Sequence, residues 1–216
     1  LSVKCCVPVC VKEASEVVRI KYVVGEPEVN LCSEHASRFR KIEHYWGLIS
    51  EDAFNRLHSL LGTALILLGN AVLLFAMDFN DASAVMIRAT LETALHSVLS
   101  MKNPQFTNGM LIKYEHDETY DRFSLRQLID AAEEKGLLDN ELVKRCADKI
   151  KDYGNFAAHI GERQWKQLKE IAIAKKIDSS ELKLWTNDSD AEEAIDCIIK
   201  VISHLTSKII PENPKQ

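Results

Sequence analysis

The spacing of cysteine and histidine near the N-terminus constrains the fold of this chain most. Cys5 and Cys10 have four residues between them, Cys32 follows after twenty-one more, and His35 lies three positions further on. Structural zinc sites take four thiolate or imidazole ligands in a tetrahedron, and a short spacing lets one turn supply two of them. The sequence therefore predicts a zinc ion bound by Cys5, Cys10, Cys32 and His35. Its role is expected to be structural, because four protein ligands leave no position open for substrate or water.

Two alternatives stay open for these cysteines. Cys6 is also spaced to pair with Cys10, so it is an alternative to Cys5 as the first ligand. A disulfide or unrelated free thiols would be a second explanation, although a disulfide is unusual in the cytoplasm. A segment this short also has too little core to fold without a staple, which favours the metal. The remaining cysteines, Cys146 and Cys197, fall in helix-like segments and are expected to be core thiols.

The same segment is the only one that has the sequence pattern of β-strands. EVVRIKYVV, from Glu16, alternates apolar and polar residues, Gly25 begins a turn, and EVNL returns. The order of knuckle, hairpin and helix, with LCSEH carrying the second ligand pair, resembles a treble-clef or zinc-ribbon-like finger. Its charges are nearly balanced and its aromatic residues are few, so structural support or a protein contact is expected of it rather than DNA readout.

After Ser33 the apolar residues recur at helical spacing. Caps and breakers place helices at about 34–45, 51–77, 82–101, 124–136, 139–151, 162–176 and 191–210. The sequence thus predicts a mainly α protein, with a zinc-finger-like module over residues 1–46 and a helical bundle domain over residues 50–210.

One segment of this bundle resembles a membrane span in length. Residues 59–77 carry no charge, but Gly62, Gly69 and Asn70 interrupt them and no aromatic belt flanks them. A helix buried at the centre of an all-α domain has the same pattern. With no secretory signal in view, the expectation is a cytoplasmic protein without a membrane partner.

Charge limits the kind of partner. The net charge of −5 argues against a protein that coats nucleic acid electrostatically. Residues 141–176 nevertheless hold nine Lys or Arg against five Asp or Glu. Such a local excess is compatible with a phosphate contact, and it is also common on an ordinary solvated helix face.

Two helix-like segments each carry three polar residues at positions i, i+4 and i+8: Arg88, Glu92 and His96 in one, and Lys151, Asn155 and His159 in the other. On a continuous helix each set lies on one face. Because the first segment is otherwise apolar or small, its polar residues must reach a seam or a polar partner. The two sets are therefore expected to face each other or to flank one cleft.

The stretches AVMIRATLE, GNFAAH and DAEEAIDCIIKVISHL, in this order, resemble the domain-of-unknown-function family 4145. That family belongs to the HEPN group of helical bundles, and the resemblance covers about residues 50–210. It implies a homodimeric domain that binds RNA or a nucleotide, in a prokaryotic defence or stress-response setting. Lys151, Arg88 and His96 are the binding residues that it suggests here.

Active HEPN ribonucleases carry an Arg-x4-6-His motif, in which Arg stabilises charge on the phosphate and His transfers protons. Asn155 and His159 match this pattern, but Gly154 stands where the motif has Arg. Arg88, oriented by Glu92, is the alternative source of a guanidinium. Metal-independent RNA cleavage by His159 is therefore one hypothesis beside RNA or nucleotide binding, and a non-enzymatic dimerising interaction module is another. In a purely structural interpretation, the polar residues form a packing seam and Gly154 lets two helices approach.

Overall fold

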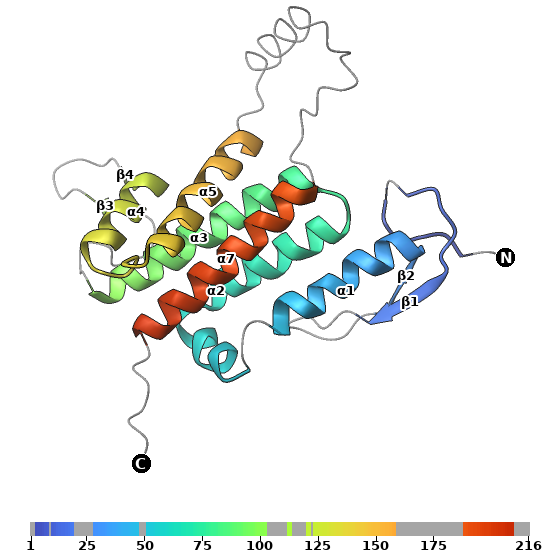
Figure 1. Cartoon of the computed structure of the whole chain (residues 1–216), viewed down its shortest axis with the longest axis horizontal. Helices are drawn as coiled ribbons and strands as arrows, with labels where there is room; N and C mark the ends of the chain where they lie inside the picture. The colour runs from blue at the N-terminus through green and yellow to red at the C-terminus, as the bar shows by residue number, and fades with distance from the viewer. Residues whose placement is uncertain are drawn as a thin grey trace, which may run out of the picture.

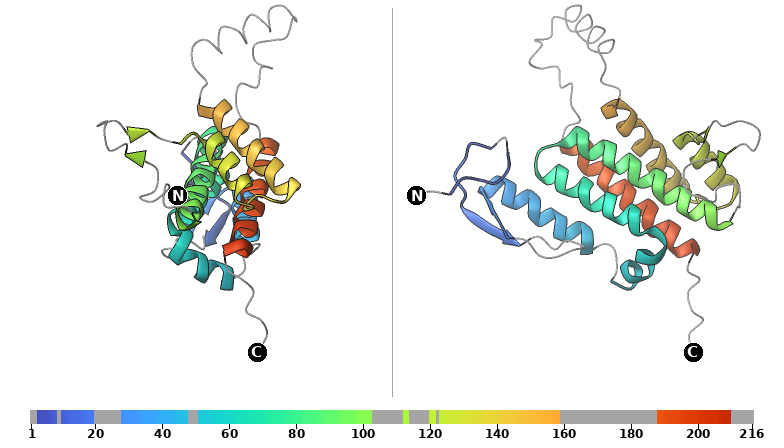
Figure 2. Two further views of the ribbon diagram at one scale, coloured as in Figure 1. Left: turned by 90° about the vertical axis from the view of Figure 1, so that its left-hand side faces the viewer. Right: turned by 180° about the vertical axis from the view of Figure 1, so that it is seen from behind.

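The computed structural model describes residues 3–8, 10–19, 28–47, 51–102, 112–113, 120–121, 123–158 and 188–209. Within these ranges the chain is mainly helical, with six helices and a small antiparallel hairpin near the N-terminus, which confirms the expected fold class. The hairpin with α1 and the helix α4 lie at opposite ends of the bundle (Figures 1 and 2). The helix expected at 162–176 and the candidate His159 lie outside the described residues.

The N-terminal hairpin consists of β1 (Glu16–Arg19) and β2 (Glu28–Leu31). The strands are antiparallel, with Glu16 opposite Leu31 and Arg19 opposite Glu28. Arg19 Nε donates to Glu28 Oε1 over 2.7 Å, and Leu31 is fully buried. Both expected strands are therefore present, and the part of the first that extends past Arg19 lies outside the described residues.

Helix α1 (Ser33–Gly47) follows β2 after a single residue and packs on α2. Ala36 and Phe39, three positions apart, are both buried, as is Tyr45 further along. This spacing places one apolar face of α1 against the bundle. The helix begins within one residue of the position that the sequence predicts.

Helices α2 (Glu51–Ala76) and α3 (Asn80–Lys102) are the longest elements and pack against each other. Their buried residues recur three or four positions apart, from Leu61 to Phe75 in α2 and from Ile87 to Leu99 in α3. The backbone of α2 kinks at Leu61, where φ is −121° and ψ is 20°. None of the helices in the described ranges combines the length and apolar character that a membrane span needs.

Helix α3 is the centre of the bundle, because it contacts α2, α5 (Glu141–Ala158), α7 (Asp188–Ile209) and α4 (Leu125–Glu134). Helices α2, α3, α5 and α7 run side by side in Figure 1. Two buried hydroxyl residues of α3 donate hydrogen bonds to main-chain carbonyls. Ser83 Oγ donates to the carbonyl of Ala71 and Thr90 Oγ1 to the carbonyl of Met86, each over 2.8 Å. These bonds remove the cost of burying the hydroxyl groups.

Several helix ends follow from local chemistry. Ser124 and Gln127 form a reciprocal capping box at the start of α4, and Gly136 after its end has a φ of +66°, a left-handed conformation that favours glycine. The sequence predicts that α5 starts at Asp139, but the helix begins at Glu141. Asn140 is the residue that caps it, because its Oδ1 accepts from the backbone N–H of Leu142 over 2.9 Å. The expected end of α5 is also wrong, since the helix continues past Lys151 to Ala158.

Strand structure is not confined to the N-terminal hairpin, contrary to the sequence prediction. β3 (Ile112–Lys113) and β4 (Tyr120–Asp121) form a second antiparallel pair between α3 and α4. Each strand has only two residues, too few for an alternating pattern to emerge from the sequence.

Candidate functional site

The first two cysteines of the predicted metal site lie on a knuckle before β1. Cys5 follows an antiparallel bridge between Lys4 and Glu13, and its N–H donates to the carbonyl of Lys12 over 3.1 Å. The N–H of Cys10 donates to the carbonyl of Val7 over 2.9 Å, which closes a tight turn containing Pro8. Proline favours such turns because its φ is already fixed. The knuckle thus holds both thiols on one side.

The other two candidate ligands come from the junction of β2 and α1. Cys32 is the single residue between these elements, and His35 lies in the first turn of α1. The carbonyl of Cys32 accepts from the N–H of Ala36 over 2.8 Å, so the first helical turn fixes the ligand spacing. Two segments far apart in the sequence therefore supply one pair of ligands each.

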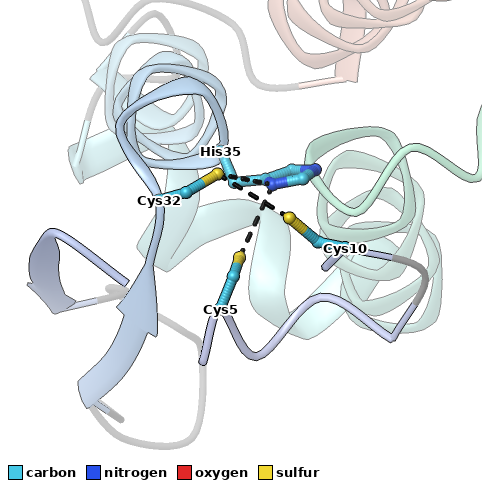
Figure 3. A group of neighbouring side chains, drawn as sticks. All are labelled: Cys5, Cys10, Cys32 and His35. Atoms are coloured by element: carbon cyan, nitrogen blue, oxygen red, sulfur yellow. Dashed lines mark hydrogen bonds between the residues drawn. The ribbon is translucent and has the colours of Figure 1, made fainter. Parts of the chain in front are cut away.

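The ligand atoms of Cys5, Cys10, Cys32 and His35 all lie within 4.8 Å of one another. His35 Nδ1 is 3.1 Å from Cys32 Sγ and 3.5 Å from Cys5 Sγ, and the sulfurs of Cys10 and Cys32 are 3.9 Å apart (Figure 3). A tetrahedron of zinc ligands with bonds of about 2.3 Å has edges of about 3.8 Å. The four side chains thus have the separation that a tetrahedral metal ion requires.

Burial and hydrogen bonding act in opposite directions on the thiols of this cluster. Burial alone would raise the pKa of Cys32, but hydrogen bonds from the backbone and the side chain of His35 bring that pKa below its ordinary value. Burial likewise opposes ionisation of Cys5, and backbone hydrogen bonds at Cys32 and Val7 lower its pKa in turn. The lowered pKa values make both thiols easier to ionise, and the thiolate is the form in which cysteine binds metal.

The structure distinguishes the two candidates for the first ligand. Cys5 is buried and belongs to the cluster, whereas Cys6 is exposed, and its N–H donates to the carbonyl of Asn30 over 2.8 Å. Cys146 and Cys197 are buried in the bundle, as expected for core thiols. Burial raises the pKa of Cys197 to about 12, and hydrogen bonding to Cys146 adds to this effect.

Sequence reasoning missed the acidic residue that contacts the cluster. Asp78 lies in the turn between α2 and α3, and its Oδ2 is 2.6 Å from Nε2 of His35. Its Oδ1 is 2.6 Å from Nη1 of Arg38 in α1. Neither partner is near Asp78 in the sequence, so no local pattern could have revealed these contacts.

The second candidate site lies where α3 packs on α5, and its closest approach is between Arg88 and Gly154. A Cβ placed on Gly154 would be 2.4 Å from Cβ of Arg88 and 2.6 Å from its Cδ. The structure therefore brings the two polar segments together at this point and confirms that Gly154 permits close helix approach. Across the described ranges, the buried Nε of Arg88 has no hydrogen-bond partner.

The other residues that the sequence predicts for this seam differ in burial and in their contacts. Lys151 and Asn155 are both on α5 and partly buried, and Lys151 Nζ is 2.9 Å from Asp148 Oδ1. Glu92 is partly buried on α3. His96 is 2% exposed, deep in the core. With His159 outside the described residues, the assignment of a site to this seam stays a prediction.

No protein-family model, curated protein or solved structure matches this chain.

Proposed function

We propose that Cys5, Cys10, Cys32 and His35 bind one zinc ion in a structural role. The observation that carries this proposal is the convergence of the four ligand atoms within 4.8 Å. Three thiolates and one imidazole form a donor set that suits zinc, whereas calcium and magnesium prefer oxygen ligands. The ion supplies a fixed crosslink between the N-terminal knuckle and the start of α1. With four protein ligands it has no coordination position left for a substrate.

The test is metal replacement in the full chain. The apoprotein, prepared with a chelator under reducing conditions, is titrated with cobalt(II) and then with zinc. We expect intense thiolate-to-cobalt absorption and tetrahedral ligand-field bands at one equivalent, both abolished by zinc. Cys32→Ser is expected to weaken or remove them. Weak octahedral bands, or wild-type spectra in Cys32→Ser, would contradict the proposal.

We also propose that the bundle is a HEPN-like domain that binds RNA or a nucleotide beside Arg88. The order of the sequence motifs supports this, as does the contact between Arg88 and Gly154, the glycine that precedes Asn155. A buried guanidinium N–H without a protein acceptor is costly, and phosphate oxygens are acceptors that suit it. Lys151 lies one helical turn before Gly154 and adds a second cation to the same region.

Salt-dependent binding of a mixed RNA pool tests this second proposal. Phosphate contacts release counterions, so affinity should fall steeply as salt rises. Arg88→Gln is expected to reduce both the affinity and the salt slope. The matched control is Arg145→Gln, which removes an exposed arginine of α5 whose Nε pairs with Glu141. Equal losses in both variants would indicate nonspecific attraction instead.

Two further measurements on the same RNA pool and the same proteins separate the alternatives that the sequence left open, which are a ribonuclease and a dimerising interaction module. RNA cleavage by the wild type that persists after a brief chelator exposure and disappears in His159→Ala would make the bundle a metal-independent ribonuclease. Dimerisation without RNA binding would leave a protein-interaction module. Size-exclusion chromatography with light scattering provides the oligomeric state for this comparison.

A further inference from the structure

His35 has contacts through both nitrogens of its ring. Nδ1 faces the sulfurs of Cys32 and Cys5, while Nε2 lies 2.6 Å from Oδ2 of Asp78. A carboxylate at this distance accepts the Nε2 proton, which leaves the lone pair of Nδ1 directed at the cysteines. Asp78 is forty-three residues from His35 in the sequence and belongs to the turn between α2 and α3.

Arg38 holds the carboxylate of Asp78 in place. Its Nη1 is 2.6 Å from Oδ1 of Asp78 and donates to the carbonyl of Phe75 over 3.3 Å. Its guanidinium also lies over the ring of Phe75, 5.5 Å from the centroid. The side chain of Arg38 is only 16% exposed, so the guanidinium itself is largely shielded from solvent. The orientation of Asp78 toward His35 is thus set by a second, well-packed side chain.

The contacts continue from Arg38 to the start of α7. Nη2 of Arg38 is 2.5 Å from Oδ2 of Asp188, whose Oδ1 accepts from Nδ2 of Asn80 over 2.8 Å. Asn80 is the first residue of α3 and Asp188 the first of α7. A continuous set of polar contacts therefore joins the metal ligand His35 to the ends of two bundle helices.

The backbone of Asp78 is in the left-handed region, which residues other than glycine adopt infrequently, aspartate and asparagine more often than most. Its φ is +66°, and it is the only residue other than glycine with a positive φ in the described part of the chain. Glycine adopts this region without strain, and a non-glycine residue there requires compensation from its surroundings. The two contacts of the carboxylate, to His35 and to Arg38, provide a reason for aspartate at this position.

We propose that Asp78 is the positioning residue of the metal site and that it couples metal binding in the N-terminal module to the bundle. The proposal rests on the proposed zinc site and extends it beyond the four ligands. By accepting the Nε2 proton, Asp78 fixes the tautomer and ring orientation of His35 and makes Nδ1 a better donor. Outer partners of this kind are worth about 10–100-fold in metal affinity.

The first test is zinc affinity of the full chain, measured by competition with a chromophoric chelator. Asp78→Gly removes the carboxylate at a φ that glycine accepts, so the turn is expected to keep its shape. We expect about 10–100-fold weaker binding. Asp78→Asn retains one acceptor oxygen and should lose less. The control is Asp130→Asn, which removes an exposed aspartate of α4 paired with Arg126 and should bind zinc as the wild type does.

The second test reports on His35 directly. In the zinc-loaded wild type, ¹⁵N chemical shifts should identify Nδ1 as the metal-bound nitrogen and Nε2 as protonated, with the Nε2 proton protected from exchange. In Asp78→Gly that protection should disappear while the far-ultraviolet circular dichroism of the bundle is retained. A merely structural role of Asp78 would not change the exchange of this one proton.

The outcomes separate the two proposals. If the wild type binds no zinc, both the proposed function and this inference fail. If the wild type binds zinc and Asp78→Gly binds it within twofold, with the His35 signals unchanged, only the role of Asp78 is overturned. If Asp78→Gly does not fold, the same comparison is made with Asp78→Ala, which also removes both acceptor oxygens; unchanged zinc affinity and unchanged proton exchange in that variant would likewise overturn the inference.

Discussion

Gly154 of α5 lies so close to Arg88 of α3 that a Cβ on the glycine would approach Cβ of the arginine to 2.4 Å. Because that atom of Arg88 is attached to the backbone, it cannot rotate away. We therefore expect Gly154→Ala to force the helices apart and to lower the free energy of unfolding by about 1–3 kcal/mol. This cost should exceed the gain of about 1 kcal/mol in helix propensity. Urea unfolding followed by circular dichroism measures the difference.

Gly62 of α2 offers a matched control for this substitution. Among the described residues, no heavy atom other than those of its chain neighbours and its own helix backbone lies within 4 Å of a Cβ placed there, and its backbone is not left-handed. Gly62→Ala should therefore be neutral or raise stability by up to about 1 kcal/mol. Equal effects of the two substitutions would contradict the close approach of α3 and α5.

Cys5 and Cys6 are adjacent in sequence but differ in burial, which makes them a matched pair for the metal site. Cys5→Ser replaces a ligand inside the cluster, so zinc content after extensive dialysis should fall well below one ion per chain. Cys6→Ser replaces an exposed thiol and should retain the full content. Metal analysis by mass spectrometry checks both. A loss in Cys6→Ser and not in Cys5→Ser would reverse the ligand assignment.

Glu193 of α7 accepts from Lys149 and Tyr153 of α5, and the Tyr153 bond is 2.6 Å long. The hydrogen bond from Lys149 is the largest cause that lowers the pKa of Glu193 below its ordinary value of 4.5, and the hydrogen bond from Tyr153 is the next largest. A carboxylate with a lowered folded pKa contributes stability above its unfolded pKa, and this contribution is lost as pH falls through the folded pKa. We expect the stability difference between wild type and Glu193→Gln to be largest near neutral pH and to shrink below about pH 4.5.

Urea unfolding of both proteins between about pH 3 and pH 7 measures this difference. Tyr153→Phe removes one of the two hydrogen bonds and should give an intermediate dependence on pH. A difference between wild type and Glu193→Gln that stays constant across this range would show that the ionised carboxylate does not contribute.

The capping box of α4 allows a local prediction of stability. Ser124→Ala removes the side-chain acceptor for the N–H of Gln127 and should cost about 0.5–2 kcal/mol. Ser207→Ala is the comparison, because its hydroxyl is exposed and donates only to the carbonyl of His204. The free energies of unfolding of the two variants, measured by chemical denaturation, should differ by most of the capping energy. Equal values would mean that the box does not stabilise α4.

The parts of this fold that the sequence predicts are those governed by local chemistry. Helix placement follows from apolar spacing, the start of α4 from the Ser124 cap, and the candidate metal ligands from the spacing of Cys5, Cys10, Cys32 and His35. The end of α5 was not predictable in this way. A glycine inside a helix is locally unfavourable, and at Gly154 the packing against Arg88 determines the outcome instead.

Asp78 was missed for a different physical reason. Its partners Arg38 and His35 are about forty residues away, and only the packing of α1 on α2 brings them within hydrogen-bonding distance. Sequence periodicity describes which face of a helix is apolar, but not which polar residue of another element will lie beside it. The long-range polar contacts that orient a ligand are therefore visible only in three dimensions.

Arg38 contacts acidic residues from two separate parts of the bundle, Asp78 and Asp188, while its own helix, α1, directly follows the N-terminal hairpin. The junction is consequently not a neutral boundary at which one module can be exchanged for another. A replacement N-terminal segment without a basic residue at this place would leave both carboxylates without the cation that they share. Residues 38, 78 and 188 are thus expected to change together during evolution, and the N-terminal segment and the bundle to be inherited as one unit.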